Sequence, residues 1–205
     1  MALCEKLINA CIAADCDNPV FEGAEPKAWI FNKSDIASIT YDATDTNIIT
    51  AITMKVVEEG QGTDPDVLAV GYTISQLGKT PFSGSSVEMA EGNYGNTFTE
   101  TVQFVVPDNS PVANALLDNM AGGKFLVVME NQYDGSDHKG KFQVYGSKKA
   151  LSATAMTREL YNDDTNGGWL ITLTAEKQPT SGVFVYTTDE ATTRTYLDSL
   201  VDCGD

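Results

Sequence analysis

Apolar and polar residues alternate along most of the chain, and this two-residue period is typical of β-strands. Residues 47–56 give the clearest case, because they are rich in β-branched side chains. Residues 125–129 form an unbroken apolar run, which predicts a strand buried on both faces. Further strands are predicted at residues 28–31, 68–77, 85–91, 97–106, 142–145, 151–157 and 169–175.

One central helix is predicted at about residues 110–121. The polar triplet 108–110 supplies an N-cap, and Pro111 suits the first helical position. The glycine pair at 122–123 then ends the helix. The face expected to pack on a sheet carries Val112, Ala115, Leu116 and Met120.

Many short strands and one central helix indicate a mainly β fold, either a β-sandwich or a partly closed barrel. A short C-terminal helix is also predicted, with a capping box made by Thr187 and Glu190 and an end near Val201. No repeat or linker divides the 205 residues, so we expect a single domain. Its parts are an N-terminal arm at 1–27, a β core at 28–187 and a C-terminal helix or tail at 188–205.

The chain is strongly acidic, with 29 Asp and Glu residues, 13 Lys and Arg residues and a formal net charge of −16. This balance excludes a general nucleic-acid groove, which needs a positive surface to neutralise phosphates. No apolar run approaches the roughly 20 residues that a membrane span requires. The opening segment contains acids and lacks the basic start of a secretory signal, so we expect a soluble protein made in a cytoplasm.

The sequence offers little for catalysis. His138 is the one histidine, which excludes a His-rich zinc site within one chain. Any Ser–His or Cys–His mechanism would have to use this residue, yet it lies in a polar stretch typical of a solvated turn. We therefore predict no catalytic residue, no metal and no cofactor.

The four cysteines, at positions 4, 11, 16 and 203, lack the CxxC spacing of zinc and redox sites. Cys4 and Cys11 belong to an apolar series at helical spacing, which favours packing roles. Synthesis in a cytoplasm favours free thiols. The sequence leaves open whether any of the four pair.

The order of these elements resembles that of the tail tube (major tail) proteins of tailed bacteriophages. Residues 30–36, 48–55 and 168–174, and the scarcity of Cys and His, are similar to structural proteins of phages that infect Bacteroides-type bacteria. The resemblance spans roughly residues 28–187. It implies a virion protein, assembled in the host cytoplasm, whose hexameric rings stack into a tube. It also implies an inner β-barrel around the DNA channel, an outer helix, contacts with other tail proteins, and passage of phage DNA without tight binding.

The segment 57–66 is the most charged connection in the chain, and its Gly and Pro residues favour a long hairpin loop over a helix. In a tube subunit it would reach toward the next ring, where its acids would meet lysines of a neighbour or repel DNA. Exposed ion pairs would contribute only about 0–1 kcal/mol each to the stability of such a contact. The alternative to a contact is that the segment is a solvated loop on the outer surface. The residues of this assembly hypothesis are Glu58, Glu59, Asp64, Asp66, Lys139, Lys141, Lys148 and Lys149.

Two other classes of protein stay open. A different virion part, such as a head–tail connector, a decoration protein or a fibre base, would form rings or trimers that do not stack. A small β-sandwich carbohydrate-binding module or enzyme would be a monomer, with Trp29 and Trp169 as candidate platforms, although core packing is the commoner role. For self-assembly, we expect strands 48–56 and 68–77 to pair with strands of an adjacent subunit.

Overall fold

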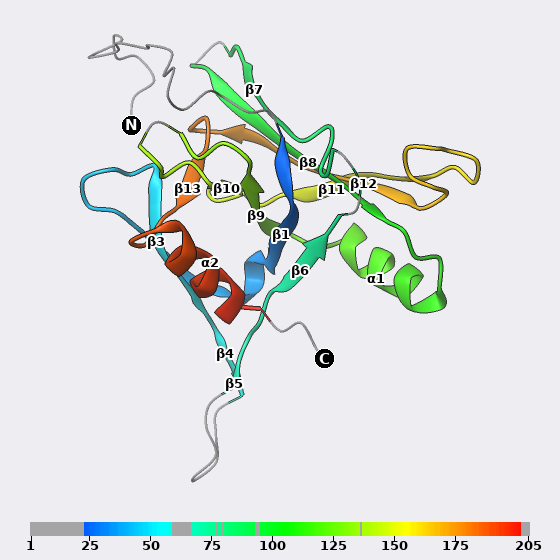
Figure 1. Cartoon of the computed structure of the whole chain (residues 1–205), viewed down its shortest axis with the longest axis horizontal. Helices are drawn as coiled ribbons and strands as arrows, with labels where there is room; N and C mark the ends of the chain where they lie inside the picture. The colour runs from blue at the N-terminus through cyan, green and yellow to red at the C-terminus, as the bar shows by residue number, and fades with distance from the viewer. Residues whose placement is uncertain are drawn as a thin grey trace.

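The computed structural model describes residues 23–58, 67–76, 78, 80–92, 95–135 and 137–201. Within these ranges the chain is mainly β, with three sheets and two α-helices, as the alternating pattern predicts (Figure 1). The strands are β1 (Ala24–Asn32), β2 (Ile36–Tyr41), β3 (Ile48–Met54), β4 (Val56–Glu58), β5 (Val67–Leu68), β6 (Tyr72–Ser75), β7 (Ser86–Ala90), β8 (Thr97–Val106), β9 (Phe125–Asn131), β10 (Phe142–Tyr145), β11 (Ser152–Arg158), β12 (Trp169–Gln178) and β13 (Val183–Val185). The α-helices are α1 (Pro111–Ala121) and α2 (Glu190–Ser199), and a 3-10 turn spans Lys33–Asp35.

Seven strands form a central sheet in the order β2-β3-β13-β10-β9-β1-β6. The neighbouring strands are antiparallel, except that β13 runs parallel to β3. The first six residues of β9 are buried, which confirms the strand predicted to be covered on both faces. Because side chains alternate along a strand, Val127 and Met129 pack on one face of the sheet and Leu126 and Val128 on the other.

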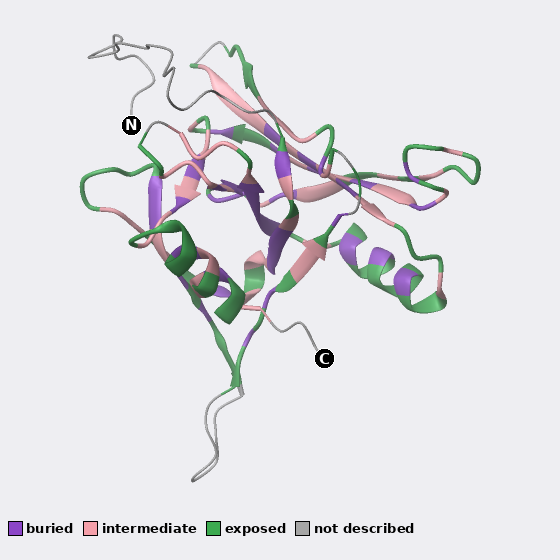
Figure 2. Cartoon of the chain, viewed as in Figure 1, coloured by how far each residue is buried: buried purple, intermediate pink, exposed green. Residues whose placement is uncertain are grey.

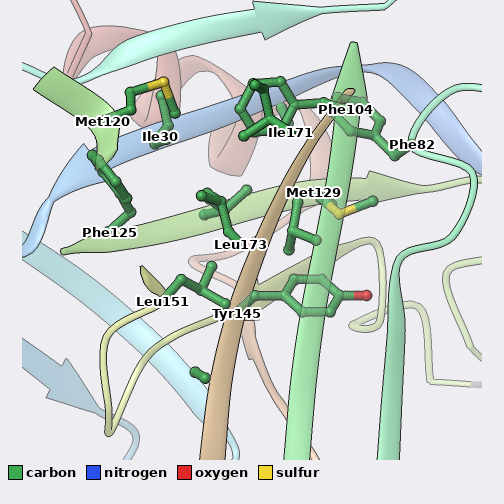
Figure 3. Close-up of a cluster of buried hydrophobic side chains, with 14 of the residues drawn as sticks. Ile30, Phe82, Phe104, Met120, Phe125, Met129, Tyr145, Leu151, Ile171 and Leu173 are labelled. Carbon is green, nitrogen blue, oxygen red and sulfur yellow. The ribbon is translucent and has the colours of Figure 1, made fainter. Parts of the chain in front are cut away.

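The second sheet, with the order β11-β12-β8-β7, covers one of these faces. Its buried side chains Phe104, Ile171 and Leu173 belong to the same apolar cluster as Ile30 and Met129 of the central sheet (Figure 3). This first core holds the two sheets together.

Helix α2 covers the opposite face of the central sheet. Its Leu197 is fully buried in a second apolar cluster that includes Trp29. Trp29 Nε1 donates a hydrogen bond to Asp198 Oδ1 at 2.8 Å, and Arg194 pairs with the buried Glu130 of β9. The complete burial of Trp29 confirms a role in the core and removes this ring as a platform for a sugar.

Both helices begin with a side-chain cap. Ser110 Oγ accepts a hydrogen bond from the backbone nitrogen of Ala113 at 3.2 Å, as predicted for α1. Helix α2 is capped by Asp189, whose Oδ1 accepts from the backbone nitrogen of Thr192 at 2.7 Å. The predicted capping box between residues 187 and 190 is therefore wrong. A carboxylate is favoured at this position because the helix N-terminus carries partial positive charge.

The predicted packing face of α1 is wrong by one residue. The buried side chains of the helix are Ala113, Leu117 and Met120, of which Leu117 and Met120 enter the first core. Val112 and Leu116, which were expected in the core, expose 79% and 53% of their surface. Both apolar stripes have helical spacing and both end at Met120, so only the position of the helix against the sheets distinguishes them.

The described sheets do not close into a barrel, so the partly closed barrel of the prediction is not found. The central sheet ends at β2 and β6, and the second sheet ends at β11 and β7. Strand β3 has β2 on one side and, at Ile48 and Ile49, β13 on the other, so this end of the strand does not form an open edge for a neighbouring subunit, contrary to expectation. All four cysteines lie outside the described residues, and their pairing stays open.

Candidate assembly surface

Strands β4 and β5 form a small antiparallel pair on either side of residues 59–66, which confirms the predicted hairpin connection. Figure 1 shows this pair, here called the β4–β5 hairpin, extending away from both larger sheets. Its base is fixed by two backbone hydrogen bonds: Lys55 donates to the carbonyl of Asp35 at 2.8 Å, and Ala69 donates to the carbonyl of Lys55 at 2.7 Å. The hairpin therefore leaves the fold at a defined place.

Strands β4 and β5 carry four exposed apolar side chains, beside Glu58 at the end of β4. Val56, Val57, Val67 and Leu68 each expose between 47% and 59% of their surface (Figure 2). An isolated two-stranded hairpin is only marginally stable in water, and surface apolar side chains are usually scattered singly. Such a concentration of valine and leucine is typical of a surface that is covered by another protein. The two adjacent valines, which break the alternation, were the available sequence signal.

A cleft of about 580 Å³ lies between β6, the end of β8 and α1, and is here called the α1–β6 cleft. The cleft lies above the first core: Phe104 and Met120 line it and also belong to that core. Its rim carries the half-exposed Tyr72 and Leu116. None of the described residues that line it is charged, although the chain has a net charge of −16.

Gln76 fixes the two strands that border the cleft. Its Oε1 accepts a hydrogen bond from the backbone nitrogen of Val105 at 2.8 Å, and its Nε2 donates to the Val105 carbonyl at 2.9 Å. This buried amide thus joins the end of β6 to the end of β8, which belong to different sheets. Because the walls are held in this way, the cleft is a preformed feature of the fold. Sequence reasoning missed it, since its walls come from distant segments.

Of the four acids of the assembly hypothesis, the structure describes one. Glu58 is the last residue of β4, whereas Glu59, Asp64 and Asp66 lie outside the described residues. Their proposed contact with a neighbouring ring stays a prediction.

The lysines of the hypothesis lie at the two ends of β10. Lys141 is largely buried, and its Nζ lies 3.9 Å from Oε1 of Glu130. Nζ of Lys148 lies 3.6 Å from the centre of the Tyr41 ring, a cation–π contact. The four residues are Lys139 and Lys141 before β10, and Lys148 and Lys149 after it. Nζ of Lys139 lies 5.8 Å from the centre of the Tyr186 ring.

Glu100 is a buried carboxylate at the junction of the two large sheets, with only 2% of its surface exposed. Its Oε2 accepts hydrogen bonds from the backbone nitrogen of Gly146 at 2.6 Å and from Nε2 of Gln178 at 3.1 Å. Gln178 also accepts a hydrogen bond from the backbone nitrogen of Lys149 and donates one to its carbonyl oxygen, in the turn that follows β10. Burial raises the pKa of Glu100 to about 7 against the opposing effect of its two hydrogen bonds.

His138 lies in an exposed turn with a φ of 56°, and its Nδ1 is 2.6 Å from Oδ2 of Asp134. This agrees with a solvated turn residue. In the part of the chain that the structure describes, no group of three His, Cys, Asp or Glu side chains is arranged to hold a metal ion. Within the same ranges, no helix has both the length and the apolar character needed to cross a membrane.

Comparison with known proteins found no match to a family model, a curated protein or a solved structure.

Proposed function

We propose that this chain is a structural protein of a bacteriophage virion, and that its copies assemble into stacked rings that form the tail tube. The observation that carries the proposal is the β4–β5 hairpin, which presents four exposed apolar side chains away from the rest of the fold. Exposed apolar surface of this kind favours burial against another protein. That the assembly is a tube is inferred from the resemblance in the order of elements.

The two large sheets support a role as a rigid subunit. We infer that they act as a β-sandwich around the first core, with α2 as a third layer on the outside. Their open edges, at β2, β6, β7 and β11, expose backbone groups of a kind that neighbouring subunits can bond. An assembled ring would cover these edges.

The charge of the chain supports passage of DNA without binding. Affinity for DNA comes largely from Lys and Arg that displace counterions from phosphates. A subunit with a net charge of −16 would present an acidic channel, which repels phosphates. DNA would then slide through the tube with little friction.

The test is assembly of the purified protein. We expect light scattering to show a concentration-dependent shift from subunits to large particles, and negative-stain images to show rings and tubes. The Val57→Ser/Leu68→Ser variant should shift this transition to higher protein concentration, because it removes apolar surface from the hairpin.

Leu160→Ser is the matched control, because Leu160 is 66% exposed but lies in the loop between β11 and β12. It should assemble as the unmodified protein does. A protein that remains monomeric at every concentration and salt would refute the proposal, and closed rings that never stack would favour another virion part.

A further inference from the structure

A polar pocket of about 440 Å³ lies beside the start of β3 and is here called the β3 pocket. Its side chains come from segments that are far apart in the sequence. Asp42 and Asp45 belong to the β2–β3 loop, Thr50 to β3, Lys139 to the turn before β10, and Tyr186 to the connection between β13 and α2. Small-molecule sites have volumes of about 300–1,000 Å³, so the pocket is large enough for a small ligand.

The walls of the β3 pocket are held by hydrogen bonds. The backbone nitrogen of Asp42 donates to the carbonyl of Ile48 at 2.9 Å, which closes the β2–β3 loop. The backbone nitrogen of Tyr186 donates to the carbonyl of Ile49 at 3.0 Å, next to the parallel pairing of β13 with β3. Tyr186 Oη donates to the carbonyl of Thr188 at 2.6 Å, which orients the ring. The pocket is therefore a preformed feature of the fold.

The pocket contains charges of both signs. Oδ1 of Asp42 accepts hydrogen bonds from the backbone nitrogens of Thr44 at 2.8 Å and Asp45 at 2.9 Å, so this carboxylate stabilises the loop. Asp45 uses only its Oδ1 within the described residues, to accept from the backbone nitrogen of Asn47 at 3.0 Å. Lys139 forms no ion pair with another described residue. One carboxylate oxygen and one ammonium group are thus available to a ligand.

These charges select against simple ions. An anion in the pocket would meet the carboxylates of Asp42 and Asp45, and a cation would meet the ammonium of Lys139. A neutral ligand that both donates and accepts hydrogen bonds avoids either repulsion. It also gains charge-assisted hydrogen bonds, which are stronger than bonds between neutral groups.

We propose that the β3 pocket binds a neutral carbohydrate. Each sugar hydroxyl both donates and accepts, so one hydroxyl donates to Asp45 and another accepts from Lys139. Nζ of Lys139 lies 5.8 Å from the centre of the Tyr186 ring, so an aromatic surface adjoins the ammonium donor. The C–H groups of the sugar pack beside this ring, and the hydroxyls of Thr50 and Thr187 line the same pocket. Binding of this kind goes beyond the proposed function, which assigns only assembly.

The test starts with an array of immobilised oligosaccharides, some neutral and some carrying sialic or uronic acids. The full-length protein should bind neutral sugars and give no signal above background on the acidic ones. The sugar bound best is then titrated by calorimetry, at protein concentrations below the assembly transition, so that lost assembly does not change the result.

Three variants remove one pocket group each. Asp45→Asn removes the charge but keeps an oxygen for the backbone nitrogen of Asn47. Lys139→Met removes the ammonium and keeps most of the side-chain length. Tyr186→Leu removes the aromatic ring. Each should weaken sugar binding at least tenfold, and thermal melts of the variants check that the fold is retained.

The chain offers matched controls for the two charge variants. Lys148→Met also removes a lysine that lies over a tyrosine ring, that of Tyr41, but Lys148 does not line the pocket. Asp164→Asn removes an exposed acid from the loop between β11 and β12. Both controls should bind the sugar within twofold of the unmodified protein.

Several results would overturn the inference. These are an array on which no neutral sugar binds, binding to acidic sugars alone, and pocket variants that bind as well as their controls. Tighter binding of the polyamine spermidine than of any neutral sugar would show that the carboxylates dominate the pocket. Light scattering tests assembly separately: assembly without sugar binding would leave the proposed function standing, and sugar binding by a permanent monomer would leave only this inference.

Discussion

At the scale of single residues, we expect Glu100 to make the stability of the fold depend on pH. Its pKa is about 7 in the fold and 4.5 ordinarily, so the folded protein holds the proton more tightly than the unfolded chain does. Protonation therefore stabilises the fold. This contribution is complete below pH 4.5 and is lost as pH rises through about 7. It amounts to about 3 kcal/mol, since each pKa unit corresponds to 1.36 kcal/mol.

Replacement of this carboxyl by an amide should remove that dependence. We expect the free energy of unfolding of the unmodified protein to fall, relative to Glu100→Gln, between about pH 5 and pH 8. Urea unfolding of both proteins at several pH values measures the difference, and other titrating groups cancel in the comparison. Two curves that stay parallel across this range would show that Glu100 does not titrate there.

At the scale of elements, α1 contributes one stripe of side chains to the first core and a neighbouring stripe to the α1–β6 cleft. Leu117→Ala should lower the free energy of unfolding by about 2–5 kcal/mol, because it leaves a cavity in the core. Leu116→Ala should change it by about 0.5 kcal/mol or less, because Leu116 is half exposed. Chemical denaturation measures both, and equal losses would mean that the helix is rotated from the position described.

The sequence predicts well those elements whose type and position follow from their own residues alone. The apolar run of β9 and the cap, proline and glycines of α1 identify these elements without knowledge of their neighbours. The missed strands are β2 and β13. Three residues such as Val183–Val185 carry too little pattern, and their strand conformation depends on pairing with β3 and β10. The hairpin was predicted as a charged loop, and its apolar strands were not singled out.

At the scale of the whole molecule, protection from hydrogen exchange should separate the rigid core from the assembly surface. Amides of β9 should exchange slowly in free and assembled protein, because this strand is buried on both faces. Amides of the β4–β5 hairpin should exchange quickly in the free subunit and slowly after assembly. Mass spectrometry of peptides measures both. The exposed Leu160 and Tyr161 supply the internal control, since their loop should exchange quickly in both states.

The parallel pairing of β13 with β3 affects the order in which a subunit can be made. Phe184 pairs with Ile48 and Val185 with Ile49, so a strand from late in the chain fills the place between β3 and β10. During synthesis that place stays vacant until residues 183–185 leave the ribosome. A product truncated before them would lack the strand that joins the two halves of the central sheet. If copies assemble as proposed, an unfinished chain would be excluded from the polymer, because its central sheet is incomplete.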